Sequence, residues 1–212
     1  MRGQVRILAS ASALAESLSD DVASFLKDPR HKNIQVDMEE RGSPDIVRGI
    51  RDGTASLGIC WDAADIGSLH SRPYRSDHLV MVVPKGHPLA SRRKLRFSET
   101  LDHEHVSLPV NSAVQVMVHR AAAQLGRSVR HRVVVTNFEA ALRVVRAGLA
   151  ISLVPREVAE IYTQAYGLKA IMLDEPWAER RFIICLRDAQ SLSPAAQLLL
   201  EHLEHLAHHH RT

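Results

Sequence analysis

The sequence predicts an α/β fold in which strands alternate with helices through most of the chain. Short apolar runs bounded by Gly or Pro are typical of strands, and apolar residues at spacings of three and four between them indicate helices. A strand–helix–strand–helix–strand order implies a parallel sheet with right-handed crossovers. The 212 residues, 45% of them hydrophobic, are enough for one large domain or two small lobes with their own cores.

The first part of the chain contains one such series of elements. We expect, in order, a strand at residues 5–8, a helix at 14–25, a strand at 34–38, a short helix at 46–50 that ends at Gly53, and a strand at 56–60. In the strand at 34–38 apolar and polar residues alternate, as they do when one face of a strand is buried.

The pattern restarts after residue 70. We expect a strand at 78–83, a turn at 98–101, a strand at 105–108, a helix at 114–125, a strand at 132–135, a helix whose apolar face carries Leu142, Val145 and Leu149, a strand at 151–154, a helix with Val158, Ile161 and Tyr162, strands at 168–173 and 181–186, and a final helix at 198–206. The histidine-rich tail, residues 206–212, is given no function.

Composition and motifs exclude several classes of protein. With 27 basic and 24 acidic residues the net charge is +3, which is too small to indicate nucleic-acid binding by this piece alone. Cys60 and Cys185 lack a metal-ligand spacing and suit packing roles in a reducing compartment. The sequence shows no signal region and no bilayer-spanning stretch, so we expect a cytoplasmic protein that does not enter a membrane.

We expect no catalytic residue, no metal and no cofactor. The segment Asp102-His103-Glu104-His105 places two histidines two residues apart without a third ligand nearby, which favours a solvated turn. We expect His87 to hydrogen-bond backbone in its loop. Nucleophile elbows, phosphate loops and zinc-protease motifs are missing, so the sequence favours a binding protein over an enzyme.

Small polar residues stand at four predicted junctions between a strand and the following helix. Ser12, with Ser10 close by, follows the first strand, and Ser43 follows the second, with Pro44 at the favoured first helical position. Ser112 stands three residues before Gln115, and Thr136 stands three residues before Glu139. This is the spacing of a capping box at a helix N-terminus. Helix N-termini carry free N–H groups and partial positive charge, so they attract anions. We expect these hydroxyls to cap their helices and the ligand to be a small anion, most simply a carboxylate. Each cap taken alone is better explained by stability, at about 1 kcal/mol, and the ligand hypothesis rests on the shared location of all four.

Other residues flank these junctions. Trp61, after Cys60 at the end of its strand, fits either a surface that stacks on a ligand or the core. Arg41 fits either a contact to a carboxylate or an exposed surface. Asn111, Asn137 and Phe138 lie beside two of the caps.

Two longer segments make the sequence recognisable. Residues 82–90 contain Gly86-His87-Pro88-Leu89-Ala90 after an apolar strand, and residues 145–155 contain a helix ended by Gly148 and an apolar strand ended by Pro155. Together with Glu40-Arg41-Gly42-Ser43 and Thr136-Asn137, they resemble the effector-binding domain of LysR-type transcriptional regulators over nearly the whole chain. Ser56 and Ala150 depart from the residues usual in that family, Asp and Gly, without threatening the fold.

The resemblance implies two Rossmann-like lobes joined by two crossover strands, as in type-2 periplasmic binding proteins, with a ligand cleft between the lobes. It implies one lobe at residues 1–76 plus 182–212 and another at 77–181. The implied effector-binding residues are Ser10, Ala11, Ser12, Arg41, Gly42, Ser43, Cys60, Trp61, Asn111, Ser112, Ala113, Thr136, Asn137 and Phe138.

The resemblance also implies partners. We expect a small-molecule effector and a homodimer, or a tetramer in the full-length protein, with the helices at 14–25 and 114–125 in the dimer contact. DNA would be bound only through an N-terminal helix-turn-helix domain, which this sequence lacks. The alternative is a transport solute-binding protein of the same fold.

Overall fold

The computed structural model describes residues 2–209, and the chain divides into two compact units. Unit 1 comprises Met1–Ser76 and Arg181–Thr212, and unit 2 comprises Asp77–Arg180. Two strands, β4 (His70–Pro84) and β10 (Glu179–Leu186), each run from one unit into the other. The end of the histidine-rich tail, residues 210–212, lies outside the described residues.

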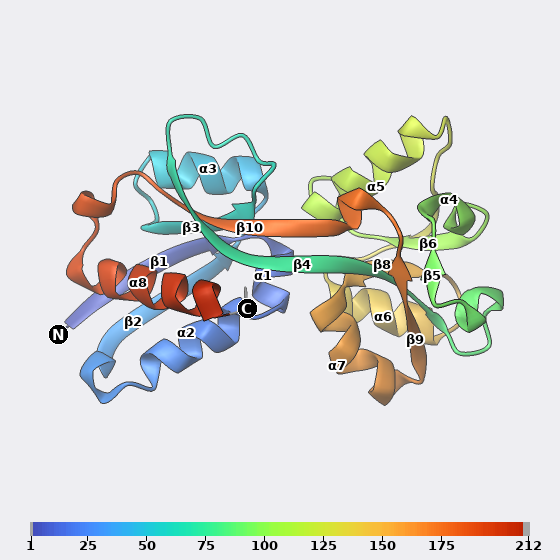
Figure 1. The fold of residues 1–212 in the computed structure, drawn as a ribbon, viewed down its shortest axis with the longest axis horizontal. Helices are drawn as coiled ribbons and strands as arrows, with labels where there is room; N and C mark the ends of the chain where they lie inside the picture. The colour runs from blue at the N-terminus through green and yellow to red at the C-terminus, as the bar shows by residue number, and fades with distance from the viewer. Residues whose placement is uncertain (1, 210–212) are drawn as a thin grey trace. The chain divides into compact units, whose positions relative to one another are not determined.

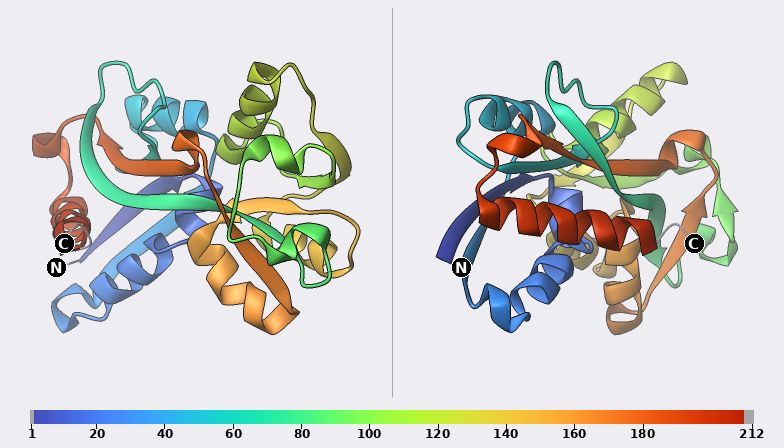
Figure 2. Two further views of the ribbon diagram at one scale, coloured as in Figure 1. Left: turned by 45° about the vertical axis from the view of Figure 1, so that its right-hand side comes forward. Right: turned by 60° about the vertical axis from the view of Figure 1, so that its left-hand side comes forward.

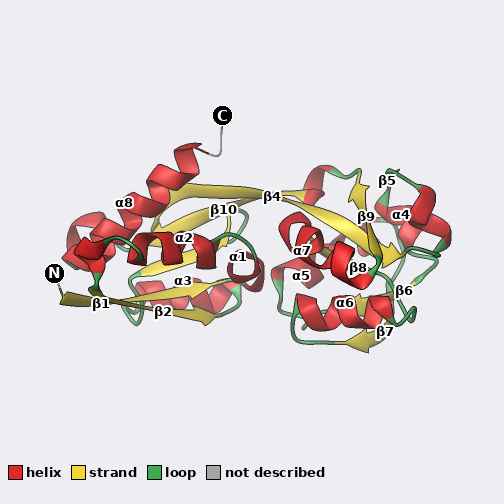
Figure 3. Ribbon diagram, turned by 90° about the horizontal axis from the view of Figure 1, so that it is seen from below, coloured by secondary structure: helices red, strands yellow, loops and turns green. Residues whose placement is uncertain are grey.

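Unit 1 is built on a mixed sheet with the strand order β2-β1-β3-β10. Figure 3 shows β1 and β2 side by side. The strand β1 (Arg2–Ala9) pairs in parallel with β2 (Asn33–Glu40) and with β3 (Leu57–Trp61), as the order of elements predicts. The last strand, β10, pairs with β3 in the antiparallel sense. The carboxyl ends of three parallel strands therefore meet at one edge of this sheet.

Helices cover both faces of the sheet in unit 1 (Figure 1). The helices α2 (Leu18–Leu26) and α8 (Pro194–His209) bury apolar residues such as Phe25 and Leu203 against one face. The helix α3 (Ser43–Arg51) buries Ile46 and Ile50 against the other face. Each face of the sheet thus has its own apolar layer, which is the arrangement of a Rossmann-like unit.

The first predicted helix, residues 14–25, is in fact two helices. The chain forms a short helix α1 (Ala11–Ala15), turns at Glu16 and Ser17, and continues as α2. Leu14 is only partly buried, while Leu18, Val22 and Phe25 are buried on α2. The apolar spacing therefore predicted the buried face of α2 correctly. It did not predict the two-residue interruption at Glu16 and Ser17.

Unit 2 holds the remaining strands and helices. In chain order these are η2 (Pro88–Ser91), β5 (Lys94–Leu95), α4 (Phe97–Thr100), β6 (Glu104–Ser107), α5 (Ala113–Gln124), β7 (Arg130–Val134), α6 (Phe138–Arg146), β8 (Ser152–Pro155), α7 (Arg156–Tyr166), β9 (Leu168–Leu173) and η3 (Pro176–Ala178). The short strand β5 was not expected from the sequence. In η2, Nδ1 of His87 accepts a hydrogen bond from the Leu89 N–H at 3.2 Å, which confirms its predicted backbone role.

The sheet of unit 2 is also mixed. The strand β4 pairs antiparallel with β8 on one side and with β9 on the other, and β5 joins β9 in parallel. The strands β6 and β7 form a separate parallel pair, which an isolated bridge from His105 to Ile151 connects to the segment before β8. Two views show α6 and α7 side by side on one face of these strands and α5 on the other (Figures 1 and 2).

Three residues expected on the buried faces of helices in unit 2 are not buried. Leu149 follows the end of α6 and is 49% exposed, Ile161 on α7 is 65% exposed, and Leu125 at the end of α5 is 49% exposed. Gly148 ends α6 with a positive φ of 75°, so the chain has already left the helix at Leu149. Their neighbours Val145, Val158 and Ala121 are buried as predicted.

Two ion pairs hold β4 on either side of the boundary between the units. In unit 1, Arg75 donates to both carboxylate oxygens of Asp21 on α2, at 2.9 and 2.6 Å, and the Tyr74 hydroxyl also donates to Asp21. In unit 2, Arg180 on β10 pairs with Asp77 on β4, and the residue Arg180 is only 1% exposed. A buried ion pair costs much of its Coulomb energy in desolvation, so it fixes geometry more than it adds stability.

Candidate functional site

The candidate site in unit 1 is built at the carboxyl ends of β1, β2 and β3. The Ser10 N–H donates to the Ile59 carbonyl at 3.0 Å, and the Arg41 N–H donates to the Ala9 carbonyl at 2.9 Å. These two backbone bonds fasten the loops after β1 and β2 to the neighbouring strands. They bring together eight of the predicted site residues, namely Ser10, Ala11, Ser12, Arg41, Gly42, Ser43, Cys60 and Trp61.

The cap of the first helix is Ser10 and not Ser12. Oγ of Ser10 accepts from the Ala13 N–H at 3.4 Å, whereas Ser12 lies within the first turn of α1 and is buried. Ala11, the first residue of the helix, is half-buried. The sequence prediction assigned the α1 cap to Ser12, two residues after the true cap, Ser10. Both serines precede apolar residues at helical spacing, so this pattern does not distinguish between them.

The cap of α3 is Gly42, so the predicted capping role of Ser43 is wrong. Ser43 is the first helical residue, Pro44 is the second, and no side chain caps this helix. Gly at the N-cap is well tolerated, and Pro is favoured within the first turn because its missing N–H is not needed there. Ser43 and Pro44 line a surface cavity of about 390 Å³ together with Arg48 and Arg51.

The remaining predicted residues of unit 1 have defined partners. Arg41 is exposed and pairs with Glu39, and its guanidinium also donates to the Glu40 carbonyl at 3.0 Å. Arg6 and Arg41 together lower the pKa of the Glu39 carboxyl. Cys60 is 0% exposed and packs with Cys185 in the core, where the hydrogen bond with the Cys185 thiol and then burial raise the pKa of Cys60. Trp61, the last residue of β3, is half-buried.

The candidate site in unit 2 lies at the carboxyl ends of β6 and β7. The two strands are parallel, and the Val135 N–H beyond β7 donates to the Ser107 carbonyl at the end of β6, at 2.9 Å. The starts of α5 and α6 both follow these strand ends. Unit 2 therefore gathers the other six predicted residues, Asn111, Ser112, Ala113, Thr136, Asn137 and Phe138.

Ser112 caps α5 as predicted. Its Oγ accepts from the Gln115 N–H at 3.2 Å, with Asn111 exposed before it and Ala113 as the first helical residue. The return half of the predicted capping box is not formed. Oε1 of Gln115 accepts from the Leu108 N–H at 3.2 Å instead, and the Ser112 N–H donates to the Pro109 carbonyl.

The cap of α6 is Asn137, so the predicted capping role of Thr136 is wrong. Oδ1 of Asn137 accepts from the Ala140 N–H at 2.9 Å, and Thr136 lies exposed just outside the helix. Asn is at least as good a cap as Thr, so the one-residue displacement has a plain physical reason. Phe138, the first residue of α6, is buried.

Acidic residues occupy the first turns of two of these helices, and each is paired. Asp45 on α3 forms an ion pair with Arg48, and Glu139 on α6 forms one with Arg143 at 2.7 Å. A carboxylate in the first turn competes with an external anion for the helix N-terminus. Because each carboxylate is neutralised by an arginine, the first turns of α3 and α6 carry no uncompensated negative charge from these residues.

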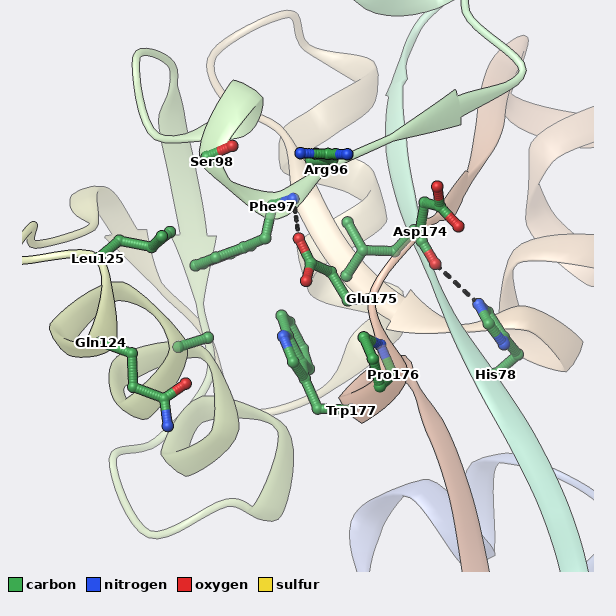
Figure 4. A pocket seen from close by; sticks show the side chains of 12 residues that line it. His78, Arg96, Phe97, Ser98, Gln124, Leu125, Asp174, Glu175, Pro176 and Trp177 are labelled. Atoms are coloured by element: carbon green, nitrogen blue, oxygen red, sulfur yellow. Dashed lines mark hydrogen bonds between the residues drawn. The ribbon is translucent and has the colours of Figure 1, made fainter.

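Unit 2 also contains a cavity of about 630 Å³ that no sequence pattern indicates (Figure 4). Phe97 and Trp177 meet edge to face there, with ring centres 5.3 Å apart, and the Phe97 N–H donates to Glu175 at 2.8 Å. The residues that line this cavity come from four separate parts of unit 2: the middle of β4, α4, the end of α5 and the segment after β9. Residues so far apart in sequence share no spacing that could reveal a common cavity.

Comparison with known proteins identifies the family. The model of the LysR substrate binding domain matches residues 1–207. This chain belongs to that family. The RuBisCO operon transcriptional regulator of Allochromatium vinosum is 24% identical over 195 residues, which are 92% of this chain and 64% of that protein. The chain thus spans less than two thirds of the length of this relative.

Solved structures show the same fold. The effector binding domain of QuiR in complex with shikimate has a TM-score of 0.83 at 19% identity, with 99% of both chains covered. The BenM effector binding domain with its effector benzoate has a TM-score of 0.78 at 19% identity, with 99% of this chain and 94% of that chain covered. This LysR substrate binding domain therefore has the predicted α/β, periplasmic-binding-protein-like fold. No helix within residues 2–209 has the length and hydropathy needed to cross a bilayer.

Proposed function

We propose that this chain is the effector-sensing part of a LysR-type transcriptional regulator and that its effector is a small carboxylate. Membership of the LysR substrate binding domain family supports a binding role. Shikimate and benzoate, which QuiR and BenM bind, both carry a carboxylate. The comparisons do not favour the alternative, a transport solute-binding protein. We propose sensing rather than catalysis for this chain.

The observation that carries the proposal is that two hydroxyls beside helix starts are not used as caps. Gly42 and Asn137 hold the cap positions of α3 and α6, so neither Ser43 nor Thr136 accepts the capping bond. The Thr136 hydroxyl accepts a long hydrogen bond, 3.5 Å, from Nδ2 of its neighbour Asn137. Both hydroxyls can therefore donate to an anion that approaches the first-turn N–H groups.

The electrostatics agree with an anionic ligand. The nine-residue helices α3 and α6 present their N-termini at strand ends, and their first-turn acids are paired with arginines. A carboxylate would gain charge-assisted hydrogen bonds there. We propose that the ligand-binding groups are Ser43 and Trp61 in unit 1 and Ser112 and Thr136 in unit 2.

Such a ligand would signal by binding one conformation of the chain more tightly than another. We further propose that the complete regulator is cytoplasmic, that it binds DNA through a segment outside this sequence, and that it forms dimers through α2 and α5.

The proposal is tested by a thermal-shift screen of small carboxylic acids on the wild-type chain, on Ser43→Ala and on Thr136→Val. Because neither hydroxyl caps a helix, both variants should keep the melting temperature of the ligand-free wild type. With an acid that stabilises the wild type, each variant should lose most of the ligand-induced increase. Ser128→Ala, which removes an exposed hydroxyl in the loop before β7, is the matched control and should respond like the wild type. An undiminished increase in both site variants would refute the site.

A further inference from the structure

Two histidine side chains of unit 2 meet on its surface, beside the first turn of α5. His119 lies on α5 and His131 lies on β7, and their Nε2 atoms are 3.2 Å apart. Both residues are exposed, with ring centres separated by 5.4 Å. They come from two regular elements of the same unit, so the backbone holds the two rings near each other.

The separation of the two nitrogens suits a shared metal ion. Zn²⁺ binds imidazole nitrogen at about 2.0–2.1 Å in tetrahedral geometry, which places two such nitrogens about 3.3 Å apart. The observed 3.2 Å is within a few tenths of an ångström of that distance. We propose that His119 and His131 form a binding site for a divalent transition-metal ion such as Zn²⁺.

Ser107 holds one of the two rings in the orientation that a metal ligand needs. Its buried hydroxyl, at the end of β6, is hydrogen-bonded to Nδ1 of His131. When Nε2 of a histidine binds a metal, Nδ1 carries the proton and donates it to a neighbouring acceptor. The serine oxygen is such an acceptor, so Ser107 acts as a positioning residue for His131.

Gln115 shows which form of His119 is present. Because Oε1 of Gln115 accepts from the Leu108 N–H, its amide Nε2 points at Nε2 of His119, at 2.9 Å. An amide N–H donates, so Nε2 of His119 offers its lone pair. That lone pair is the one a metal requires, and the ion has only hydrogen bonds to displace.

The donor set indicates the class of metal. Neutral imidazole suits Zn²⁺, Cu²⁺ and Ni²⁺, whereas Mg²⁺ and Ca²⁺ prefer carboxylate and carbonyl oxygens. Within the described residues no group of three His, Cys, Asp or Glu side chains is placed to hold an ion. The two imidazoles would therefore leave further positions of the ion to water or to an external ligand, and the ion would tie α5 to β7.

The test is calorimetric titration with ZnCl₂. Because the tail residues His208, His209 and His210 can also bind zinc, they are first replaced by alanine, and this tail variant is the reference. The reference should bind one zinc ion per chain, and the ion should raise its melting temperature. A reference that takes up no zinc overturns the proposal.

Further substitutions on the reference locate the ion. His119→Asn and His131→Asn should each weaken zinc binding at least about tenfold, and Ser107→Ala, which keeps both rings, should weaken it about tenfold. His70→Asn removes an exposed histidine of unit 1 and should leave the affinity unchanged. Unchanged affinity in either His119→Asn or His131→Asn shows that zinc binds elsewhere and overturns the proposal. Melting temperatures without zinc verify that each variant is folded.

Discussion

Acidification should destabilise unit 2 through one buried histidine, His105 on β6. Its ring is buried, and Nε2 hydrogen-bonds the Thr100 carbonyl at 2.9 Å. Burial lowers the pKa of His105 from 6.5 to about 4, because the charged ring would lose its solvation. His131 and His103 lower this pKa further, while the Thr100 carbonyl and Glu104 oppose the effect.

The sign and size of the effect follow from the two pKa values. Below pH 6.5 the unfolded chain takes up a proton that the folded chain refuses until about pH 4. The free energy of unfolding therefore falls as the pH decreases from about 6.5 to about 4 and levels off below that. The whole difference of 2.5 between the pKa values corresponds to about 3.4 kcal/mol, of which about 2.5 kcal/mol is lost by pH 4.5.

Urea denaturation of the wild type and of His105→Gln measures this loss. Glutamine can donate to the Thr100 carbonyl but does not titrate, so the variant lacks this source of pH dependence. The stability of the wild type relative to the variant should decrease by about 2.5 kcal/mol between pH 7.5 and pH 4.5. Parallel pH profiles for the two proteins would refute the reasoning, because they would show that the His105 ring is protonated as readily in the folded chain as in the unfolded chain.

Two further predictions concern stability and are measured by urea denaturation at pH 7.5. Asp77→Ala should lower the free energy of unfolding by about 3–5 kcal/mol, because it removes the carboxylate that pairs with the buried charge of Arg180; a loss below 1 kcal/mol would contradict a stabilising role for this buried pair. Ser112→Ala should cost about 1 kcal/mol through loss of the α5 cap, whereas Ser43→Ala should cost nothing measurable. Equal losses in the two serine variants would contradict the assignment of Gly42 as the α3 cap.

The elements of the fold could be predicted where an apolar pattern marks a buried face. The spacing of Leu18, Val22 and Phe25 locates the buried side of α2, and the strand ends that carry Ser10 and Trp61 are within a few residues of their predicted places. The long strand β4 was underestimated because residues 70–76 are mostly polar and have no alternating pattern. The spacing of apolar residues also cannot reveal that β10 pairs with β3 in the antiparallel sense.

Ser112 was predicted correctly as the cap of α5, but the cap residues of α3 and α6 could not be identified from the sequence, for a physical reason. Thr136 and Asn137 are adjacent and both can cap a helix, so local preference does not choose between them. The cap residue of α3 is Gly42, which has no side chain, so the sequence contains no polar residue that marks this position. Pairs such as Asp77 with Arg180, and His119 with His131, depend on tertiary placement of residues that share no motif.

The most direct test of the proposed carboxylate site is a crystal structure of the chain with an acid selected by the thermal-shift screen. We predict that the carboxylate oxygens lie within hydrogen-bonding distance of the Ser43 and Thr136 side chains or of the first-turn N–H groups beside them. An acid bound in the 630 Å³ cavity beside Trp177, with both hydroxyls left in solvent, would contradict the proposal that these helix starts recognise the effector.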